Sequence, residues 1–223
     1  MAVNQLSTCP LAHELNRVLA EGAGTPIQWS DATTRVGFIE TSRSPIATNQ
    51  TLWIAFCRAA QAAAEYSGLP KSHAQGLIGA MREIEENIHL HSQRARDGVV
   101  GYRATREEFE FAIADNGIGV LASLRQSPHY ANLLDPGTAI RLALTDGESR
   151  FRHENTGRGY GFHDLFVGLA NLNCRLRFRS EDHAMTIDGT TPSLMRARLS
   201  QGVRLQGFVS SVACRLSSPS VSH

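Results

Sequence analysis

A β-rich run that ends in a glycine turn, EFEFAIADNGIG at residues 108–119, decides the fold of this chain. The run from Glu108 to Ala114 follows a second β-rich run from Val99 to Ala104, and only a short polar turn separates them. Two such runs at this spacing predict an antiparallel pair of strands. The second strand is expected to end at Asp115.

The turn after this strand has the composition of a ligand-binding loop. Asp115 brings a carboxylate to the end of the strand, while Gly117 and Gly119 let the backbone approach a flat ligand closely. A carboxylate buried there can accept a hydrogen bond from the exocyclic amine of adenine. Two other interpretations remain open. One is an ordinary turn, and the other is a loose dinucleotide-binding fingerprint at residues 117–122, which a preceding aspartate disfavours by repelling a pyrophosphate.

A long helix is predicted upstream, with Ser72 as its N-cap and its end near Arg96. Its apolar residues recur at spacings of four, three and four, which is one buried stripe of an α-helix. They are Leu77, Met81, Ile84 and Ile88.

Glu83 and Asn87 lie four residues apart on this helix, so both side chains project from one face beside the apolar stripe. An asparagine oxygen is a hard donor that Mg²⁺ accepts together with phosphate oxygens and waters. A glutamate one turn earlier can orient and deprotonate an attacking water. A solvated helix face is the alternative interpretation of the pair.

Glycines alternate in a third segment, Gly157-Arg158-Gly159-Tyr160-Gly161, directly before an apolar stretch that predicts a helix. Backbone N–H groups and the positive end of that helix would face an anion, for which phosphate is the natural guest. Arg158 can add positive charge. A flexible lid hinge without ligand contact is the alternative.

The remaining elements are predicted from periodicity and turn residues. A helix is expected from Gln50 to Tyr66, a short one near 11–20, and a mobile cover segment over 120–156, with a short helix at 139–145. Further strands are expected at 26–29, 36–39, 174–180, 184–188 and 203–214, where 184–188 returns from a tight turn. The Ser-rich residues 217–223 are expected to form a disordered tail.

In this order and spacing, with about 28 residues from Asn87 to Asp115, the three segments resemble the nucleotide pocket of the GHKL, or histidine-kinase-like, ATPase superfamily. The resemblance covers roughly residues 52–216. It implies an α+β fold, a two-layer α/β sandwich of the Bergerat type with a mixed sheet and helices on one face. It divides the chain into an N-terminal extension (1–50), an ATP-binding domain (51–216) and the tail.

The resemblance also implies ATP and Mg²⁺ as cofactors and assigns a role to each segment. Glu83 would activate or orient water, Asn87 would bind Mg²⁺, and Asp115 would read adenine from a loop completed by Gly117 and Gly119. The loop over the phosphates would be formed by Gly157, Arg158, Gly159, Tyr160 and Gly161.

The chain departs from the family pattern in two places. Many histidine kinases carry a basic residue three positions after the asparagine, where this chain has Leu90, so Arg158 or Arg125 would have to meet the phosphate charge. The late Gly-Thr that lines the adenine site is also missing. Its nearest counterpart is Gly202-Val203, with Thr186 as a substitute.

Composition excludes several other classes of protein. Lys71 is the only lysine, which excludes a P-loop and argues against a eukaryotic-type protein kinase or a pyridoxal enzyme. A net charge of +1 indicates neither nucleic acid nor an anionic membrane as a partner. The first basic residue is Arg17 and the chain lacks a long uncharged apolar run, so neither a signal peptide nor a transmembrane helix is expected. We therefore expect a cytoplasmic protein.

The cysteines form no CxxC pair, so free buried thiols are expected rather than a zinc or redox motif. They are Cys9, Cys57, Cys174 and Cys214. His89 and His91 point apart on a helix, which disfavours chelation. His13 is disfavoured as a phosphoacceptor because glycines and prolines between residues 22 and 45 would break a two-helix hairpin.

Two functions remain open. The chain is either an enzyme, an ATPase or a stand-alone protein kinase of the anti-sigma type, or a switch in which ATP orders the cover segment and changes partner affinity. Both imply a regulatory protein partner and leave room for a homodimer.

Overall fold

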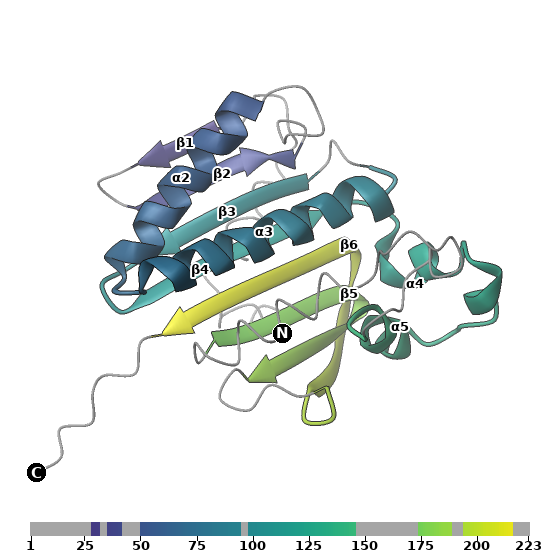
Figure 1. Ribbon diagram of the computed structural model, residues 1–223. Helices are drawn as coiled ribbons and strands as arrows, with labels where there is room; N and C mark the ends of the chain where they lie inside the picture. The colour runs from purple at the N-terminus through teal and green to yellow at the C-terminus, as the bar shows by residue number, and fades with distance from the viewer. Residues whose placement is uncertain are drawn as a thin grey trace, which may run out of the picture.

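The computed structural model describes residues 28–31, 35–41, 50–94, 98–145, 174–188 and 194–215. Its strands form one six-stranded sheet in the order β1-β2-β3-β4-β6-β5 (Figure 1). Their bounds are β1 Gln28–Asp31, β2 Val36–Glu40, β3 Gly98–Ala104, β4 Glu108–Asp115, β5 Cys174–Asp188 and β6 Arg198–Arg215. The described residues therefore form an α+β fold.

Neighbouring strands in this described sheet are all antiparallel, so the expected mixed sheet is wrong for this part of the chain. A single crossover helix would make neighbouring strands parallel. Here two helices in succession join β2 to β3. β4 and β5 run parallel to each other but are not neighbours, because β6 lies between them.

The two long helices, α2 (Gln50–Tyr66) and α3 (Lys71–His91), lie on one face of the sheet (Figure 1). The predicted bounds of α2 are confirmed. The N-cap of α3 is Pro70 rather than Ser72, and the helix ends five residues earlier than expected, at His91. It ends there because the backbone turns away two residues later, where Gln93 adopts a φ of 58°.

The predicted apolar stripe of α3 is confirmed, since Leu77, Met81, Ile84 and Ile88 are all buried. They belong to the main core together with strand residues such as Phe111. Burying a side chain of this size contributes roughly 1.5–3 kcal/mol.

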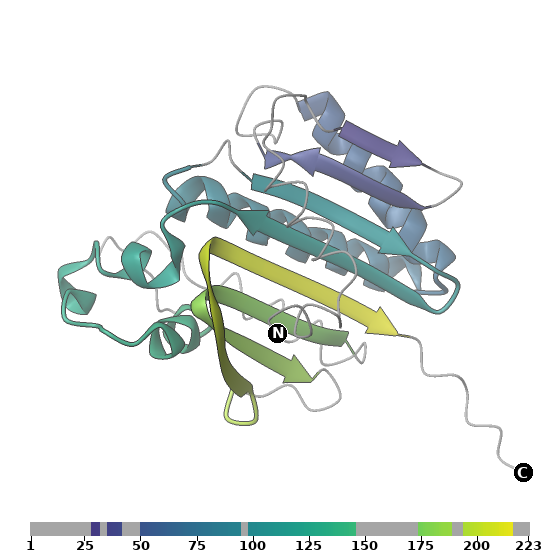
Figure 2. The ribbon, with the colours of Figure 1, turned by 180° about the vertical axis from the view of Figure 1, so that it is seen from behind.

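Alternation along β4 decides which face each of its residues occupies. Ile113 belongs to the main core under α2 and α3, whereas Ala112 and Ala114 belong to a second cluster with Val99. Figure 2 shows the sheet from the side opposite the two helices. Because Asp115 is in phase with Ile113, its side chain is on the helix-facing side.

The end of the sheet is continued by a long two-stranded arm, which we define as residues 181–188 of β5 and 198–206 of β6 (Figure 1). The tight turn predicted before Ala184 is wrong, because β5 runs unbroken from Cys174 to Asp188. The chain bends instead of reversing. The pairing register with β6 shifts around Glu181, where φ is 53°, and Gly207 on the opposite strand has a φ of 80°.

Three short helical segments follow the Asp115 loop: α4 (Gly119–Leu124), η4 (Pro128–Tyr130) and α5 (Pro136–Ala143). α4 and α5 contact β5, and Tyr130 of η4 packs against α4 and α5. The three segments occupy the first part of the expected cover segment. The helix predicted at 139–145 thus begins earlier than expected, at Pro136, because Asp135 caps it by accepting a hydrogen bond from the Thr138 N–H.

Cys174 and Cys214 form a disulfide, so the expectation of free thiols is wrong for this pair. They are 40 residues apart in sequence but are direct cross-strand partners on β5 and β6, with their Cα atoms 4.0 Å apart. Cys57 keeps its thiol, and burial raises its pKa to about 12. Cys9 lies outside the described residues.

β1 and β2 lie within the segment predicted as an N-terminal extension, yet both are strands of the same sheet. The boundary predicted at residue 50 therefore does not coincide with an edge of this sheet. The helices predicted near 11–20 and after Gly161, and the tail 217–223, lie outside the described residues. Among the described helices, none has both the length and the apolar character needed to cross a membrane.

Candidate functional site

Asp115 ends β4 with its side chain buried between the sheet and the helix layer. It pairs with Gly98 of β3 and Phe208 of β6, and only 4% of its surface is exposed. Its Oδ1 accepts a hydrogen bond from the N–H of Gly117 at 2.7 Å. Burial raises the pKa of this carboxyl to about 6, and the Gly117 hydrogen bond opposes the shift without cancelling it. The site thus contains a buried acid that gains from a further hydrogen-bond donor.

The loop after Asp115 rests on the end of α3. The Ile118 N–H donates to the carbonyl oxygen of Ser92 at 3.0 Å, and a Cβ at Gly117 would lie 2.4 Å from that same oxygen. Only glycine leaves room for so close an approach. This contact places the C-terminal end of α3 directly beside the loop.

Gly207 of β6 closes the other side of the loop. A Cβ at this position would lie 1.9 Å from the Asp115 carbonyl oxygen, and its φ of 80° favours glycine as well. The neighbouring Gln206 donates from Nε2 to the Asn116 carbonyl oxygen at 3.2 Å. Asp115 therefore lies between α3 and β6, each in close contact with its loop.

Gly207 is the site residue that the sequence analysis missed. The nearest counterpart proposed there, Gly202-Val203, lies in the arm, and so does Thr186, which pairs with Arg198. A usable signal was the position of Gly207 at the start of the apolar stretch of the last strand. Without the pairing register of the strands, there was no reason in the sequence to choose Gly207 over Gly202 as the glycine of the site.

Glu83 and Asn87 lie on the part of α3 that leads toward the loop. Both are partly buried, and the Oε2 atom of Glu83 is inaccessible to solvent. Asn87 precedes Ser92 by five residues, which is about 7.5 Å along a helix axis. Both residues therefore lie on the helix whose C-terminal end contacts the Asp115 loop.

The two histidines on α3 have different partners, in keeping with their expected divergence. His89 Nε2 is 2.7 Å from the Glu85 carboxylate, and His91 Nδ1 is 3.4 Å from the Ser123 hydroxyl. Within the described residues there is no cluster of three or more His, Cys, Asp or Glu side chains arranged to hold a metal ion.

The third predicted segment, from Gly157 to Gly161, lies outside the described residues, and with it Arg158, Gly159 and Tyr160. The other candidate for phosphate charge, Arg125, donates from Nε to the carbonyl oxygen of Leu133 at 2.6 Å. Its guanidinium therefore braces the turn between α4 and α5.

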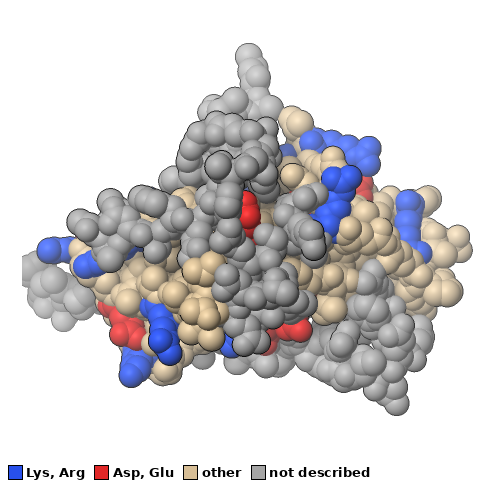
Figure 3. All heavy atoms as spheres, turned by 90° about the horizontal axis from the view of Figure 1, so that it is seen from above, with Lys and Arg blue, Asp and Glu red and all other residues tan. Residues whose placement is uncertain are grey.

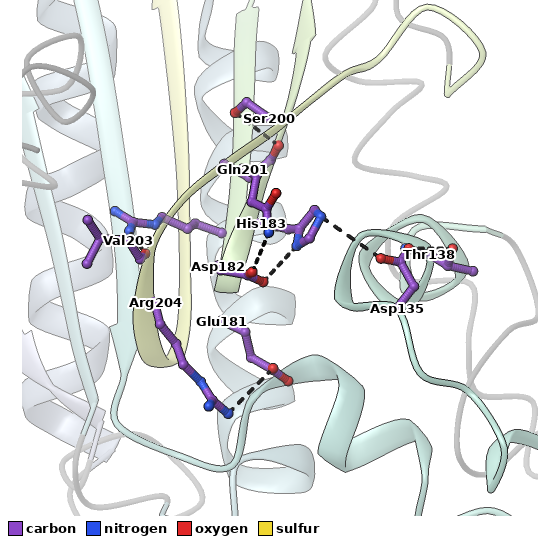
Figure 4. Close-up of polar contacts among 11 residues, drawn as sticks. Asp135, Thr138, Glu181, Asp182, His183, Ser200, Gln201, Val203 and Arg204 are labelled. Atoms are coloured by element: carbon purple, nitrogen blue, oxygen red, sulfur yellow. Dashed lines mark hydrogen bonds and ion pairs between the residues drawn. The ribbon is translucent and has the colours of Figure 1, made fainter.

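The first part of the cover segment is held at three points by the arm and by the residues next to it. Ser180, just before the arm, accepts from the Val120 N–H at 3.0 Å, and Arg141 on α5 donates to the Leu194 carbonyl oxygen at 2.8 Å. Between these contacts, His183 faces Asp135 at the start of α5, as Figure 4 shows.

Comparison of the chain with protein-family models, with curated proteins and with solved structures returns no match.

Proposed function

We propose that this chain binds ATP, with Mg²⁺, between α3 and the loop that follows β4, as a member of the histidine-kinase-like ATPase superfamily with a Bergerat-type fold. The observation that carries the proposal is the buried carboxyl of Asp115. Among the described residues this carboxyl accepts one hydrogen bond, from Gly117, and burial disfavours its charged form. The exocyclic amine of adenine would supply the second donor and restore the charge.

The residues near this site fit a magnesium ion that is shared with phosphate. Mg²⁺ is commonly bound through one or two protein oxygens, with the rest of its octahedron supplied by phosphates and waters. Asn87 offers such an oxygen. When bound, the ion would neutralise charge on the phosphates.

In the enzymatic form of the proposal, Glu83 is the general base. It lies one turn before Asn87 on the same helix, and its Oε2 is shielded from solvent, so the carboxylate is a candidate to accept a proton from a bound water. An attacking water or a partner's hydroxyl would transfer its proton to this carboxylate.

The alternative is a switch without chemistry, and one contact favours it. The cover segment starts directly after the Asp115 loop, at Val120, whose N–H is held by Ser180. A nucleotide that orders the loop would thereby also order the first turn of α4, and this could change affinity for a protein partner.

The face of the molecule in Figure 3 shows basic and acidic side chains interspersed rather than segregated. Nucleic-acid recognition would instead favour a continuous basic stripe. The described part of this face thus shows no feature that indicates a nucleic-acid partner.

Binding is tested by calorimetry with a non-hydrolysable ATP analogue and Mg²⁺. We expect Asp115→Ala to weaken binding at least about tenfold, because one lost charge-assisted hydrogen bond is worth about 1.5–3 kcal/mol. Glu86→Ala, an exposed change on α3, serves as the control and should bind like wild type. Wild-type affinity in Asp115→Ala would refute the pocket.

Chemistry is tested by following a radiolabelled γ-phosphate. Release of phosphate defines an ATPase, transfer to protein defines a kinase, and tight binding with neither defines a switch. In the first two cases Glu83→Ala should bind ATP normally and stop turnover, whereas Glu86→Ala should keep it. Turnover that survives Glu83→Ala would remove Glu83 from the mechanism.

A further inference from the structure

Ser180 is a buried hydroxyl that joins two segments on either side of the candidate site. It lies at the last position of β5 before the arm and is 1% exposed. Its Oγ donates to the Gly207 carbonyl oxygen at 2.9 Å and accepts from the Val120 N–H at 3.0 Å. One hydroxyl can make both bonds at once, because it has one donor and two acceptor positions.

Both partners of Ser180 belong to the surroundings of Asp115. Gly207 is packed against the Asp115 carbonyl oxygen, and Val120 follows Gly119 at the end of the loop. The space for the hydroxyl is created by Gly119, where a Cβ would lie 3.0 Å from the Ser180 Oγ and φ is 78°. The hydroxyl thus ties the loop to the strand that closes it.

The bond to Val120 also replaces a missing helix cap. The first N–H groups of a helix have no partner within the helix. The N-cap residue of α4, Ile118, has no side-chain hydrogen bond to offer, and the hydroxyl of Ser180, distant in sequence, satisfies the Val120 N–H instead. The beginning of α4 is therefore fixed by β5.

We propose that Ser180 is a positioning residue of the nucleotide site, holding the Asp115 loop, the start of α4 and Gly207 in one arrangement. This inference rests on the proposed function for its effect on ligand binding. The ordering of the loop by Ser180 does not depend on nucleotide binding, because it follows from the two hydrogen bonds alone.

The chain offers a matched control for removing this hydroxyl. Ser210 lies on the adjacent strand β6 and is also buried, with 0% exposed, and its Oγ has no hydrogen-bond partner. Ser210→Ala therefore removes a buried hydroxyl without breaking a bond. Ser180→Ala removes an equal group but leaves the Val120 N–H and the Gly207 carbonyl without their partner, which is costly inside a protein.

The experiment compares wild type, Ser180→Ala and Ser210→Ala in three measurements. These are affinity for the ATP analogue by calorimetry, hydrogen exchange at the Val120 amide, and titration of the Asp115 carboxyl by NMR without nucleotide. In Ser180→Ala we expect about tenfold weaker binding and at least about tenfold faster exchange at Val120. The Asp115 titration should move toward its ordinary range as the loop loosens. Ser210→Ala should match wild type in all three.

Wild-type behaviour of Ser180→Ala at Val120 and at Asp115 would overturn the inference, and so would equal effects in both variants. If wild type binds no nucleotide, the proposed function fails. The exchange and titration measurements then decide the role of Ser180 in ordering the loop without it.

Discussion

At the scale of single residues, the buried carboxyl of Asp115 lowers the stability of the folded chain when it is charged, and it also offers a hydrogen-bond acceptor to a ligand. Its carboxyl is buried at the end of a strand, and its pKa is raised from 3.8 to about 6. The folded chain therefore binds a proton in a pH range where the unfolded chain does not. By linkage, the stability associated with the protonated form is complete below about pH 4 and is lost as the pH rises to about 6.

Asp115→Asn tests this cost. An amide at this position can still accept from the Gly117 N–H through its oxygen, but it never becomes charged. We expect the variant to be more stable than wild type at pH 7.5 by up to about 3 kcal/mol, and to differ little at pH 4.

Urea unfolding at several pH values measures the difference. A stability gap between Asp115→Asn and wild type that does not grow from pH 4 to pH 6 would show that burial is not what shifts this group. The same variant should bind the ATP analogue poorly, because an amide cannot provide the charge that the adenine amine favours.

At the scale of elements, α5 is attached to the arm through the contact between Asp135 and His183. Asp135 caps α5, and its pKa is lowered first by hydrogen bonds from Thr138 and further by the charge of His183. His183 Nδ1 lies 2.8 Å from Asp182 Oδ1, and its Nε2 lies 4.0 Å from Asp135 Oδ1 (Figure 4). Gly137 permits this approach, since a Cβ there would be 2.9 Å from the His183 ring.

We expect Asp135→Asn to weaken the attachment of α5, because the amide keeps the cap but loses the charge that faces His183. Hydrogen exchange over residues 136–143 should be up to about fivefold faster than in wild type.

Asp135→Ala is the companion variant, since it loses the cap as well and should exchange faster than Asp135→Asn, after correction for the intrinsic rates. If Asp135→Asn exchanges like wild type, the contact between Asp135 and His183 has no part in holding α5.

Some elements could be predicted from sequence and others could not. The periodic stripe of α3 and the β-rich runs before Asp115 were sufficient because a local pattern determines them. The continuous bend of β5 and the end of α3 depend on left-handed residues, Glu181 and Gln93, which no local pattern marks. Within the candidate site, Asp115 and Gly117 could be predicted because they belong to a local sequence motif. Gly207 and Ser180 could not, because the pairing of β4, β5 and β6 is what places them at the site.

At the scale of the whole molecule, the Cys174–Cys214 disulfide fixes the edge of the sheet. It joins the first residue of β5 to the end of β6 and closes a long loop in the unfolded chain. Disulfides persist mainly in oxidising compartments, and the cytoplasmic localisation expected from sequence stays a prediction.

Replacing both cysteines by alanine should lower stability by about 2–4 kcal/mol, chiefly because the unfolded chain gains freedom. In a protein of this size the melting temperature should fall by about 5–15 °C. Thermal melts with and without reductant measure the effect, and Cys57→Ala is the control. Peptide mapping should recover 174 and 214 in one linked fragment. A double variant that melts like wild type would show that the bond is absent or without effect.

The pairing of β4 with β6 has a consequence for the order in which the molecule is assembled. Glu108 of β4 pairs with Arg215 of β6, which is synthesised about a hundred residues later. Until then β4 has no partner strand on that side. β1 to β4 and both long helices are complete by residue 115, and a nascent chain can dock them while β6 is still missing. During that interval β4 is an open edge strand that carries Phe109, Phe111 and Ile113, and such edges invite intermolecular pairing. The chain is thus most exposed to intermolecular pairing between the translation of β4 and the translation of β6.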